Sequence, residues 1–164
     1  MGVGEVLASV GPLGYVFALI GMGLMVGVTG AGSAVGLGLG GSAVVGALKK
    51  RPEAFGPCLI LAALPASQGL YGFVAFIMYS SVVAYEMSLA KGALALGSGI
   101  AMAFACFVSA KHQGNICANG ISAIGSGNNV FGNTLILAVF PELYAILSLV
   151  AAILMMGLSA SLPM

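Results

Sequence analysis

The sequence predicts an all-α membrane protein with four transmembrane helices, arranged as two duplicated, parallel hairpins. Hydrophobic residues make up 60% of the 164 residues, charged residues only 5%, and the mean hydropathy is +1.15. A soluble domain has about 25% charged residues. Long apolar runs alternate with short polar segments, and the second half of the chain repeats the first. These three observations together predict the fold class.

The shortage of charge excludes several classes of protein. Five basic and four acidic side chains leave no room for a soluble domain or a nucleic-acid surface. The N-terminal segment has Glu5 where a cleavable signal has basic residues, so we expect the first span to be retained. The three cysteines lie in apolar stretches without metal-ligand spacing, which is typical of buried structural side chains. Nothing in the sequence points to an organic cofactor.

Residues 6–48 carry no charge and are too long for a single perpendicular crossing. Pro12 predicts a helix start near residue 12. Glycines at four-residue spacing favour one long helix whose small residues allow close packing. They form two runs, Gly23 and Gly27, then Gly32, Gly36 and Gly40. The alternative is two short spans with a turn at residues 29–32.

Short polar segments divide the rest of the chain. KKRPE at residues 49–53 is a loop, because Pro52 belongs at a helix start or a break. Residues 85–88 form a connection, and GSGNN at residues 125–129 forms a turn. The expected helices cover residues of about 12–48, 54–84, 90–123 and 130–160. The first hairpin is therefore residues 1–88 and the second is residues 89–164.

Lys49, Lys50 and Arg51 predict the orientation in the membrane. Basic loops stay in the cytoplasm, so the loop at residues 49–53 and the turn at 125–129 are expected there. Both termini are then expected on the non-cytoplasmic side of the cell membrane.

The repeat has an offset of 76 residues. The segment FGPCLILAALP at 55–65 aligns with FGNTLILAVFP at 131–141. The same offset aligns Ser33, Ala34 and Gly38 with Ser109, Ala110 and Gly114. Two crossings separate equivalent points, so the hairpins are parallel, unlike the inverted repeats of many transporters. The halves differ directly after Pro65 and Pro141, where Ala66 in the first half corresponds to Glu142 in the second.

Glu142 is the candidate functional residue, since it is the sole charge in the apolar run 135–157. A charge at membrane depth costs about 2.5–3.5 kcal/mol on insertion scales, so such residues usually have a function. Spacing from the loops places Ser67, Gln68, Gln113 and Glu142 at similar depth.

Leu64, Ser67, Gln68 and Tyr71 share one face of a helix. Pro65 and Pro141 perturb the backbone beside the polar layer. Amide, hydroxyl, carboxylate and main-chain oxygens suit a hard cation. The bland alternative is that these groups only bond helices together.

Lys111 and His112 flank Gln113 at the same depth. In a continuous helix they point away from Gln113 by about 100–200°. They could line a water-filled or lipid-filled space, or Lys111 could pair with Glu142 and silence the site.

The segment FGPCLILAALPASQGLYGFVAF with PELYAIL resembles the rotor-ring proteolipid of V-type ATPases, in particular the duplicated subunit K of bacterial sodium pumps. The resemblance covers nearly the whole chain, and LPxSQGLYGF is its most specific part. It implies a homo-oligomeric ring in membrane lipid, turned by central-stalk subunits at the cytoplasmic loops and passing a stator subunit with an arginine. The chain itself would then catalyse no reaction.

The resemblance also implies residue roles. Glu142 matches the ion-binding carboxylate, Gln68 and Gln113 the amide ligands, and Leu64 the backbone carbonyl ligand. Ser67 stands in place of a threonine hydroxyl, and Tyr71 matches a tyrosine that hydrogen-bonds the carboxylate. The expected ion is Na⁺, with H⁺ alone as the alternative. Lys111 and His112 depart from the family pattern.

Two other functions stay open at this stage. One is a four-helix drug/proton antiporter, disfavoured by the parallel repeat and by the lack of tryptophan for cation–π contact. The other is a structural proteolipid, in which Glu142 would carry no ion.

Overall fold

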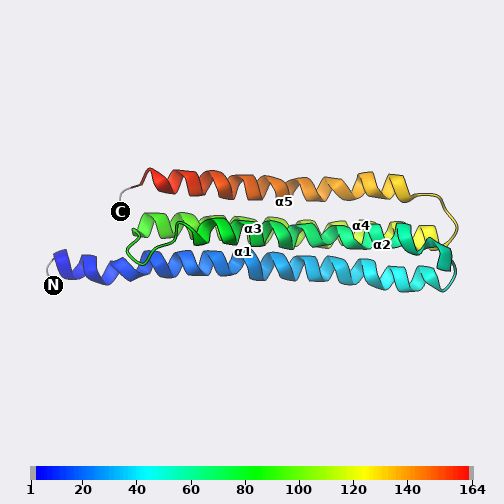
Figure 1. Cartoon of the computed structure of the whole chain (residues 1–164), viewed down its shortest axis with the longest axis horizontal. Helices are drawn as coiled ribbons and strands as arrows, with labels where there is room; N and C mark the ends of the chain where they lie inside the picture. Colours follow the sequence, from blue (N-terminus) through cyan, green and yellow to red (C-terminus); the bar gives the residue numbers. More distant parts are fainter. Residues whose placement is uncertain (1–2, 163–164) are drawn as a thin grey trace.

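The computed structural model describes the backbone of residues 3–162 and the side chains of residues 13–162. Within that part the chain is all helical and forms one elongated bundle (Figure 1). The helices are α1 (Val3–Leu48), α2 (Phe55–Ala63), α3 (Ser67–Ser80), α4 (Leu89–Gly125) and α5 (Phe131–Ala160). Two 3₁₀ turns, Pro52–Ala54 and Leu64–Ala66, precede α2 and α3. Among the described residues, four helical segments are long and apolar enough to cross a membrane, as predicted.

The two hairpins lie side by side and point the same way. Figure 1 shows the loop after α1 and the loop after α4 at one end of the bundle, and the N- and C-terminal ends of the chain at the other. The connection between the hairpins, after α3, also lies at the terminal end. The structure therefore has the parallel arrangement that the repeat predicted.

Glycines bring α1 and α4 into close contact along their length. A Cβ at Gly32 would lie 2.6 Å from the Cα of Phe107, and one at Gly114 would lie 2.5 Å from the Cα of Gly36. Neither position has room for a side chain. Small residues at such spacing let membrane helices approach closely, which was the reason for expecting one long first helix.

Helix α1 begins at Val3, which corrects the expected start near residue 12. The backbone is helical across Pro12. Membrane helices tolerate an internal proline because neighbouring groups satisfy the carbonyl that it leaves unpaired.

The second span is shorter than expected and is divided. Leu64–Ala66 form a 3₁₀ turn at Pro65, whereas α5 continues through Pro141. The span ends at Ser80, before the expected residue 84. The hydroxyls of Ser80 and Ser81 donate to the carbonyls of Ile77 and Met78. Serine side chains at such positions compete with the helical backbone bonds and favour termination.

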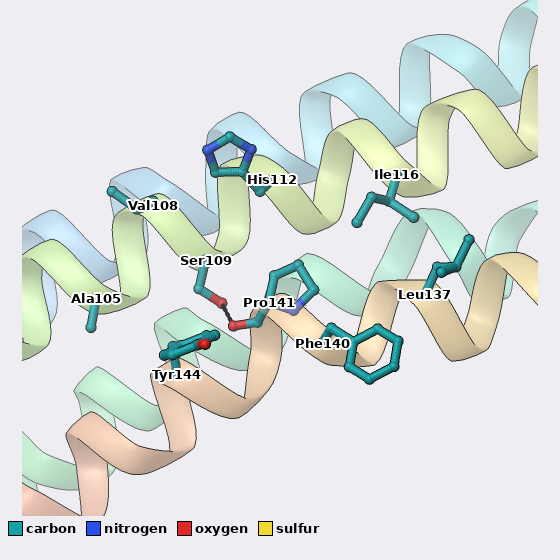
Figure 2. Close-up of a pocket in the computed structure, with 9 residues that line it drawn as sticks. All are labelled: Ala105, Val108, Ser109, His112, Ile116, Leu137, Phe140, Pro141 and Tyr144. Atoms are coloured by element: carbon teal, nitrogen blue, oxygen red, sulfur yellow. Dashed lines mark hydrogen bonds between the residues drawn. The ribbon is translucent and has the colours of Figure 1, made fainter.

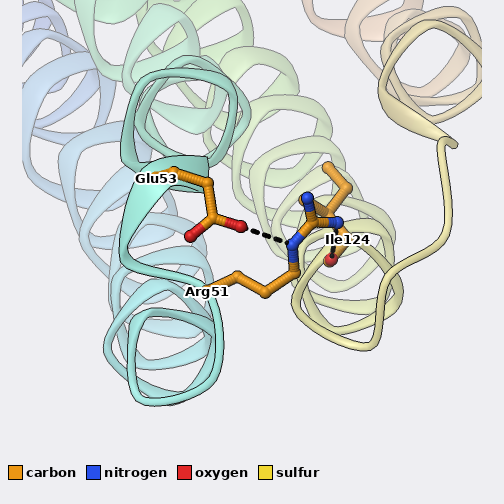
Figure 3. Close-up of polar contacts among 3 residues, drawn as sticks. All are labelled: Arg51, Glu53 and Ile124. Carbon is orange, nitrogen blue, oxygen red and sulfur yellow. Dashed lines mark hydrogen bonds and ion pairs between the residues drawn. The ribbon is translucent and has the colours of Figure 1, made fainter.

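The loop between α1 and α2 is tied to the end of α4. Arg51 Nε donates to Glu53 Oε1 at 2.8 Å, and its Nη1 reaches the carbonyl of Ile124 at 3.4 Å (Figure 3). Helix α4 ends at Gly125, and Gly127 follows with a φ of 97°, a conformation that glycine adopts without strain. The two loops at this end are thus held together across the hairpins.

The core has two apolar parts separated by a polar layer. Towards the termini, Met25, Met102 and Ala145 belong to one buried cluster. Towards the loops, Leu61 and Ile121 belong to the other. The buried amides and the carboxylate described next lie between these clusters.

Candidate ion-binding site

Glu142 projects from α5 towards α3 and α4, and each of its carboxylate oxygens accepts a hydrogen bond. The hydroxyl of Tyr71 donates to Oε1 at 2.7 Å. Nε2 of Gln113 donates to Oε2 at 3.1 Å. The carboxylate is half-buried. Hydrogen bonds to an ionised group are about twice as strong as neutral ones, so both donors hold the carboxylate in place.

The two glutamine side chains form the buried floor of the site. Gln68 and Gln113 are both fully buried. Nε2 of Gln68 donates to Oε1 of Gln113 at 2.8 Å, and Nε2 of Gln113 also donates to the carbonyl of Ala138 at 2.9 Å. That carbonyl belongs to the last turn of α5 before Pro141. The amides therefore join α3, α4 and α5 at one depth.

Ser67 and Leu64 complete the network at the start of α3. The Ser67 hydroxyl lies 3.1 Å from the carbonyl oxygen of Leu64 and 3.3 Å from Oε1 of Gln68. The 3₁₀ turn around Pro65 brings the Leu64 carbonyl beside this hydroxyl. The six site residues predicted from sequence thus lie in one connected polar network. Their roles in ion binding stay a prediction.

Sequence reasoning missed Ser109. Its hydroxyl accepts a bond from Nε2 of Gln68 at 3.1 Å. It also donates to the carbonyl of Pro141 at 2.8 Å (Figure 2). A signal was present, because Ser109 precedes Gln113 by one helical turn and is therefore on the same face.

Lys111 and His112 lie outside this network. Both side chains are exposed on α4. His112 lines a groove between α4 and α5 (Figure 2). Among the residues whose side chains are described, the one ion pair is Arg51–Glu53, so Lys111 does not neutralise Glu142. The silenced-site alternative has no support in this arrangement.

The chemistry of the layer suits a small monovalent cation or a proton. It offers one carboxylate together with amide, hydroxyl and main-chain oxygens. Every buried side-chain nitrogen and oxygen in the described part of the chain has a hydrogen-bond partner. A single negative charge can be neutralised by one Na⁺ or one H⁺, and such neutralisation removes the cost of holding a charge at membrane depth.

The fold and this layer define a duplicated membrane proteolipid with one intramembrane carboxylate. The sequence profile of the ATP synthase C-subunit family matches it twice, at residues 20–79 and 96–155. The chain belongs to that family. The two matches are offset by the same 76 residues as the internal repeat.

Two relatives extend the comparison. The V-type sodium ATPase subunit K of Enterococcus hirae is 37% identical over 143 residues, which cover 87% of this chain and 91% of the relative. The A-type ATP synthase subunit K of Methanocaldococcus jannaschii is 35% identical over 141 residues. Those residues cover 86% of this chain but 62% of that relative. The predicted class, a non-catalytic membrane subunit of the subunit K type, is confirmed.

Proposed function

We propose that this chain is the ion-carrying subunit of an ATPase rotor ring and that each copy carries one Na⁺ at Glu142. The supporting observation is the polar layer itself: both oxygens of a single intramembrane carboxylate are held by donors, and further oxygens surround it. The ion would be bound by Glu142, Gln113, Gln68, Ser67 and the Leu64 carbonyl, with Tyr71 orienting the carboxylate.

The mechanism is reversible neutralisation of charge. A bare carboxylate is costly in hydrocarbon, so Glu142 would cross the lipid-facing part of each turn only when occupied by a cation or a proton. An arginine of a stator subunit would compete for the carboxylate and release the ion. ATP hydrolysis elsewhere in the complex would drive the rotation.

Sodium is the proposed ion for two reasons. The oxygen-rich donor set suits a hard cation, and the relative from Enterococcus hirae is named a sodium ATPase subunit. Proton coupling is the alternative, because a carboxylate held by two donors can also be neutralised by a proton.

The loops supply the orientation and the contacts with the rest of the complex. Lys49, Lys50 and Arg51 lie at the loop end, which we place in the cytoplasm by the positive-inside rule. Central-stalk subunits would bind there, and both termini would lie outside the cell membrane. Residues 1–88 and 89–164 would act as the two hairpin units of each copy.

The test is the rate at which a hydrophobic carbodiimide modifies Glu142 in the purified ring, with and without Na⁺ across a range of pH. Protection by Na⁺ that weakens as the pH falls is expected, since sodium and protons compete for one carboxylate. Modification that ignores Na⁺ would instead support proton coupling. Absence of modification at every pH would contradict ion carriage by Glu142. Glu86→Gln, which removes an exposed carboxylate, is the control for specific labelling.

A further inference from the structure

Lys111 is a cation on the side of α4 that is turned away from the ion-binding site. Lys111 and Gln113 project about 200° apart around the helix, so Lys111 lies at the depth of Glu142 but on the opposite side of α4. Its side chain is exposed. Within the described part of the chain it has no hydrogen bond and no ion pair, because the one ion pair there joins Arg51 to Glu53. The fold therefore leaves one uncompensated positive charge at membrane depth.

Lys111 lies too far from both ends of α4 for its charge to reach the water there. About 21 Å of helix separates it from Gly125 at the loop end, and about 33 Å separates it from Leu89 at the other end. Side chains lean towards the N-terminus of their helix, so Lys111 leans away from the loop end. Long cationic side chains carry their charge to the interface only from near a helix end. Lys111 therefore needs an anion beside it.

A polar stripe continues from Lys111 towards the loop end on the same side of α4. Asn115 and Ser122 follow Lys111 by about one and three helical turns, which brings the three side chains onto one side of the helix. All three are exposed. Ser122 also lines a partly polar groove of about 380 Å³ between α1 and α4, together with Ser42 and Lys50. This face is thus polar from Lys111 to the loops.

The same face is apolar on the other side of Lys111. Phe104 and Ile100 precede Lys111 by about two and three helical turns and are 72% and 41% exposed. They line a second groove between α1 and α4, of about 260 Å³, together with Leu24 and Val28. The wall of that groove is entirely apolar. The change from apolar to polar surface therefore falls at Lys111, at the depth of the ion-binding layer, and not at the end of the helix.

The first hairpin has no such polar stripe. At the 76-residue offset, the counterparts of Lys111, Asn115 and Ser122 are Val35, Leu39 and Gly46. Helix α1 is continuous with apolar residues at these places, so the helical fold does not require polar ones. The stripe is specific to the second hairpin, which indicates a ligand on this face.

We propose that Lys111 and Asn115 bind the phosphate of an anionic phospholipid whose acyl chains lie in the apolar groove at Phe104. The order of surfaces along α4 is an apolar groove, a cation with an amide donor, and then a polar stripe. Acyl chain, phosphate and headgroup follow one another in the same order in a phospholipid. The inference goes beyond the proposed function, because it concerns the opposite side of α4 and does not depend on which ion Glu142 carries.

Charge complementarity selects an anionic lipid. A phosphate oxygen accepts hydrogen bonds from the Lys111 ammonium and the Asn115 amide, and bonds between charged partners are the stronger kind. No acidic side chain lines either groove, so none competes for the ammonium there. A zwitterionic lipid brings its own cation towards Lys50, whereas an anionic lipid does not. Basic pockets between transmembrane helices bind anionic headgroups for the same reason.

The proposal places the boundary between acyl chains and headgroups deeper on this face than on α5. Headgroup and water would cover the stripe from Asn115 to the loops, and acyl chains would cover only the part beyond Lys111. The phosphate would also neutralise Lys111, which leaves Glu142 as the one group at this depth whose charge changes when an ion is bound or released.

Lipid selection by the purified protein tests the proposal. Protein stripped of native lipid is equilibrated in detergent with equal amounts of phosphatidylglycerol and phosphatidylcholine, and the lipid retained after washing is measured by mass spectrometry. The attraction of one lysine for anionic lipid predicts about fivefold enrichment of phosphatidylglycerol. Lys111→Met should abolish the enrichment, whereas Lys111→Arg should retain it because the cation stays. Lys49→Met, which removes an exposed lysine at the loop, is the matched control and should keep the enrichment.

Three results of this measurement would overturn the proposal. Equal losses in Lys111→Met and Lys49→Met would trace the enrichment to general surface charge. Equal retention of the two lipids by the wild-type protein would mean that the face does not select an anion. Displacement of the retained lipid by inorganic phosphate would identify a site for free anions. None of these results bears on Glu142, whose protection by Na⁺ is measured separately.

The reactivity of introduced cysteines gives a test that leaves Lys111 in place. In a chain whose native cysteines are replaced by alanine, Asn115→Cys and Phe104→Cys lie on one face, on either side of Lys111. A charged, water-soluble maleimide should modify Asn115→Cys in nanodiscs that contain phosphatidylglycerol, and should leave Phe104→Cys unmodified, because a thiol among acyl chains stays protonated and unreactive. Both should react after denaturation in detergent. An unreactive Asn115→Cys in the nanodisc would mean that acyl chains cover the stripe, and would overturn the proposal.

Discussion

At Glu142 the two carboxylate oxygens have separate donors on separate helices. Tyr71 on α3 holds one oxygen, and Gln113 on α4 holds the other. The Gln113 amide is itself fixed by Gln68 and by the Ala138 carbonyl. Removal of one donor therefore changes the support of one oxygen and leaves the other in place, and single substitutions can separate their contributions.

Tyr71→Phe removes the donor to Oε1 and keeps the ring. A hydrogen bond to a charged group contributes about 1.5–3 kcal/mol. We therefore expect half-protection of Glu142 against carbodiimide to need about 10- to 100-fold more Na⁺. Tyr85→Phe, an exposed tyrosine in the connection between the hairpins, is the control and should change nothing. Unchanged sodium protection in Tyr71→Phe would mean that this hydroxyl does not support ion binding.

Ser109→Ala tests the residue that sequence reasoning missed. The change leaves the Pro141 carbonyl without its donor and Gln68 Nε2 with one acceptor. We expect a loss of about 1 kcal/mol in stability and a changed rate of Glu142 labelling. Thermal denaturation in detergent gives the first quantity. Ser122→Ala, an exposed serine on the same helix, should leave both unaltered, and equal behaviour of the two variants would refute the role of Ser109.

At the scale of the helices, two glycines of α1 that are two residues apart in sequence differ in their contact with α4. Gly36→Ala places a Cβ 2.5 Å from the Ala110 carbonyl oxygen, so we expect about 1–3 kcal/mol of destabilisation from overpacking. Gly38→Ala meets open space within the chain. Unfolding of the detergent-solubilised monomer should therefore show a lowered midpoint for Gly36→Ala alone. Equal midpoints would mean that α1 and α4 pack differently.

The sequence predicted the helices well because their boundaries are marked by charge and turn residues. The KKRPE and GSGNN segments fall at the loops, and the repeat gives the parallel direction of the hairpins. Boundaries set by weaker local effects were wrong. Pro12 does not begin α1, and Ser80 ends α3 through serine hydroxyl bonds to the backbone.

The candidate site was predictable in its members but not in its connections. The number of residues between each side chain and the nearest loop predicts that Gln68, Gln113 and Glu142 lie at one depth. That prediction requires only the rise per residue of a helix. Which donor bonds to which acceptor depends on how each helix is rotated about its own axis. It also depends on the 3₁₀ turn at Pro65, a feature absent at Pro141. Ser109 was not predicted because serine is common in membrane helices. Its hydrogen bonds to Gln68 and to Pro141 are tertiary contacts with other helices, which the sequence does not reveal.

At the scale of the whole molecule, two hairpins share one carboxylate. Ala66 occupies the place of Glu142 in the first hairpin, and Leu37 the place of Gln113. The first hairpin therefore lacks a carboxylate at this position, and under the proposed function each copy would carry one ion past the stator. Every copy in a rotor must complete this step in turn, so one defective copy stops the whole ring.

This dependence predicts the outcome of mixing wild-type chains with Glu142→Gln chains. The glutamine keeps the size of the side chain, so mixed rings should assemble. ATP-driven Na⁺ uptake into vesicles should fall much more steeply than the fraction of wild-type chains, and equal mixtures should be almost inactive. Chains that act alone, as in a small antiporter, would lose uptake in simple proportion. A proportional loss would therefore contradict the rotor, whereas a steep loss excludes independent carriers, because only a shared ring makes each copy necessary to all the others.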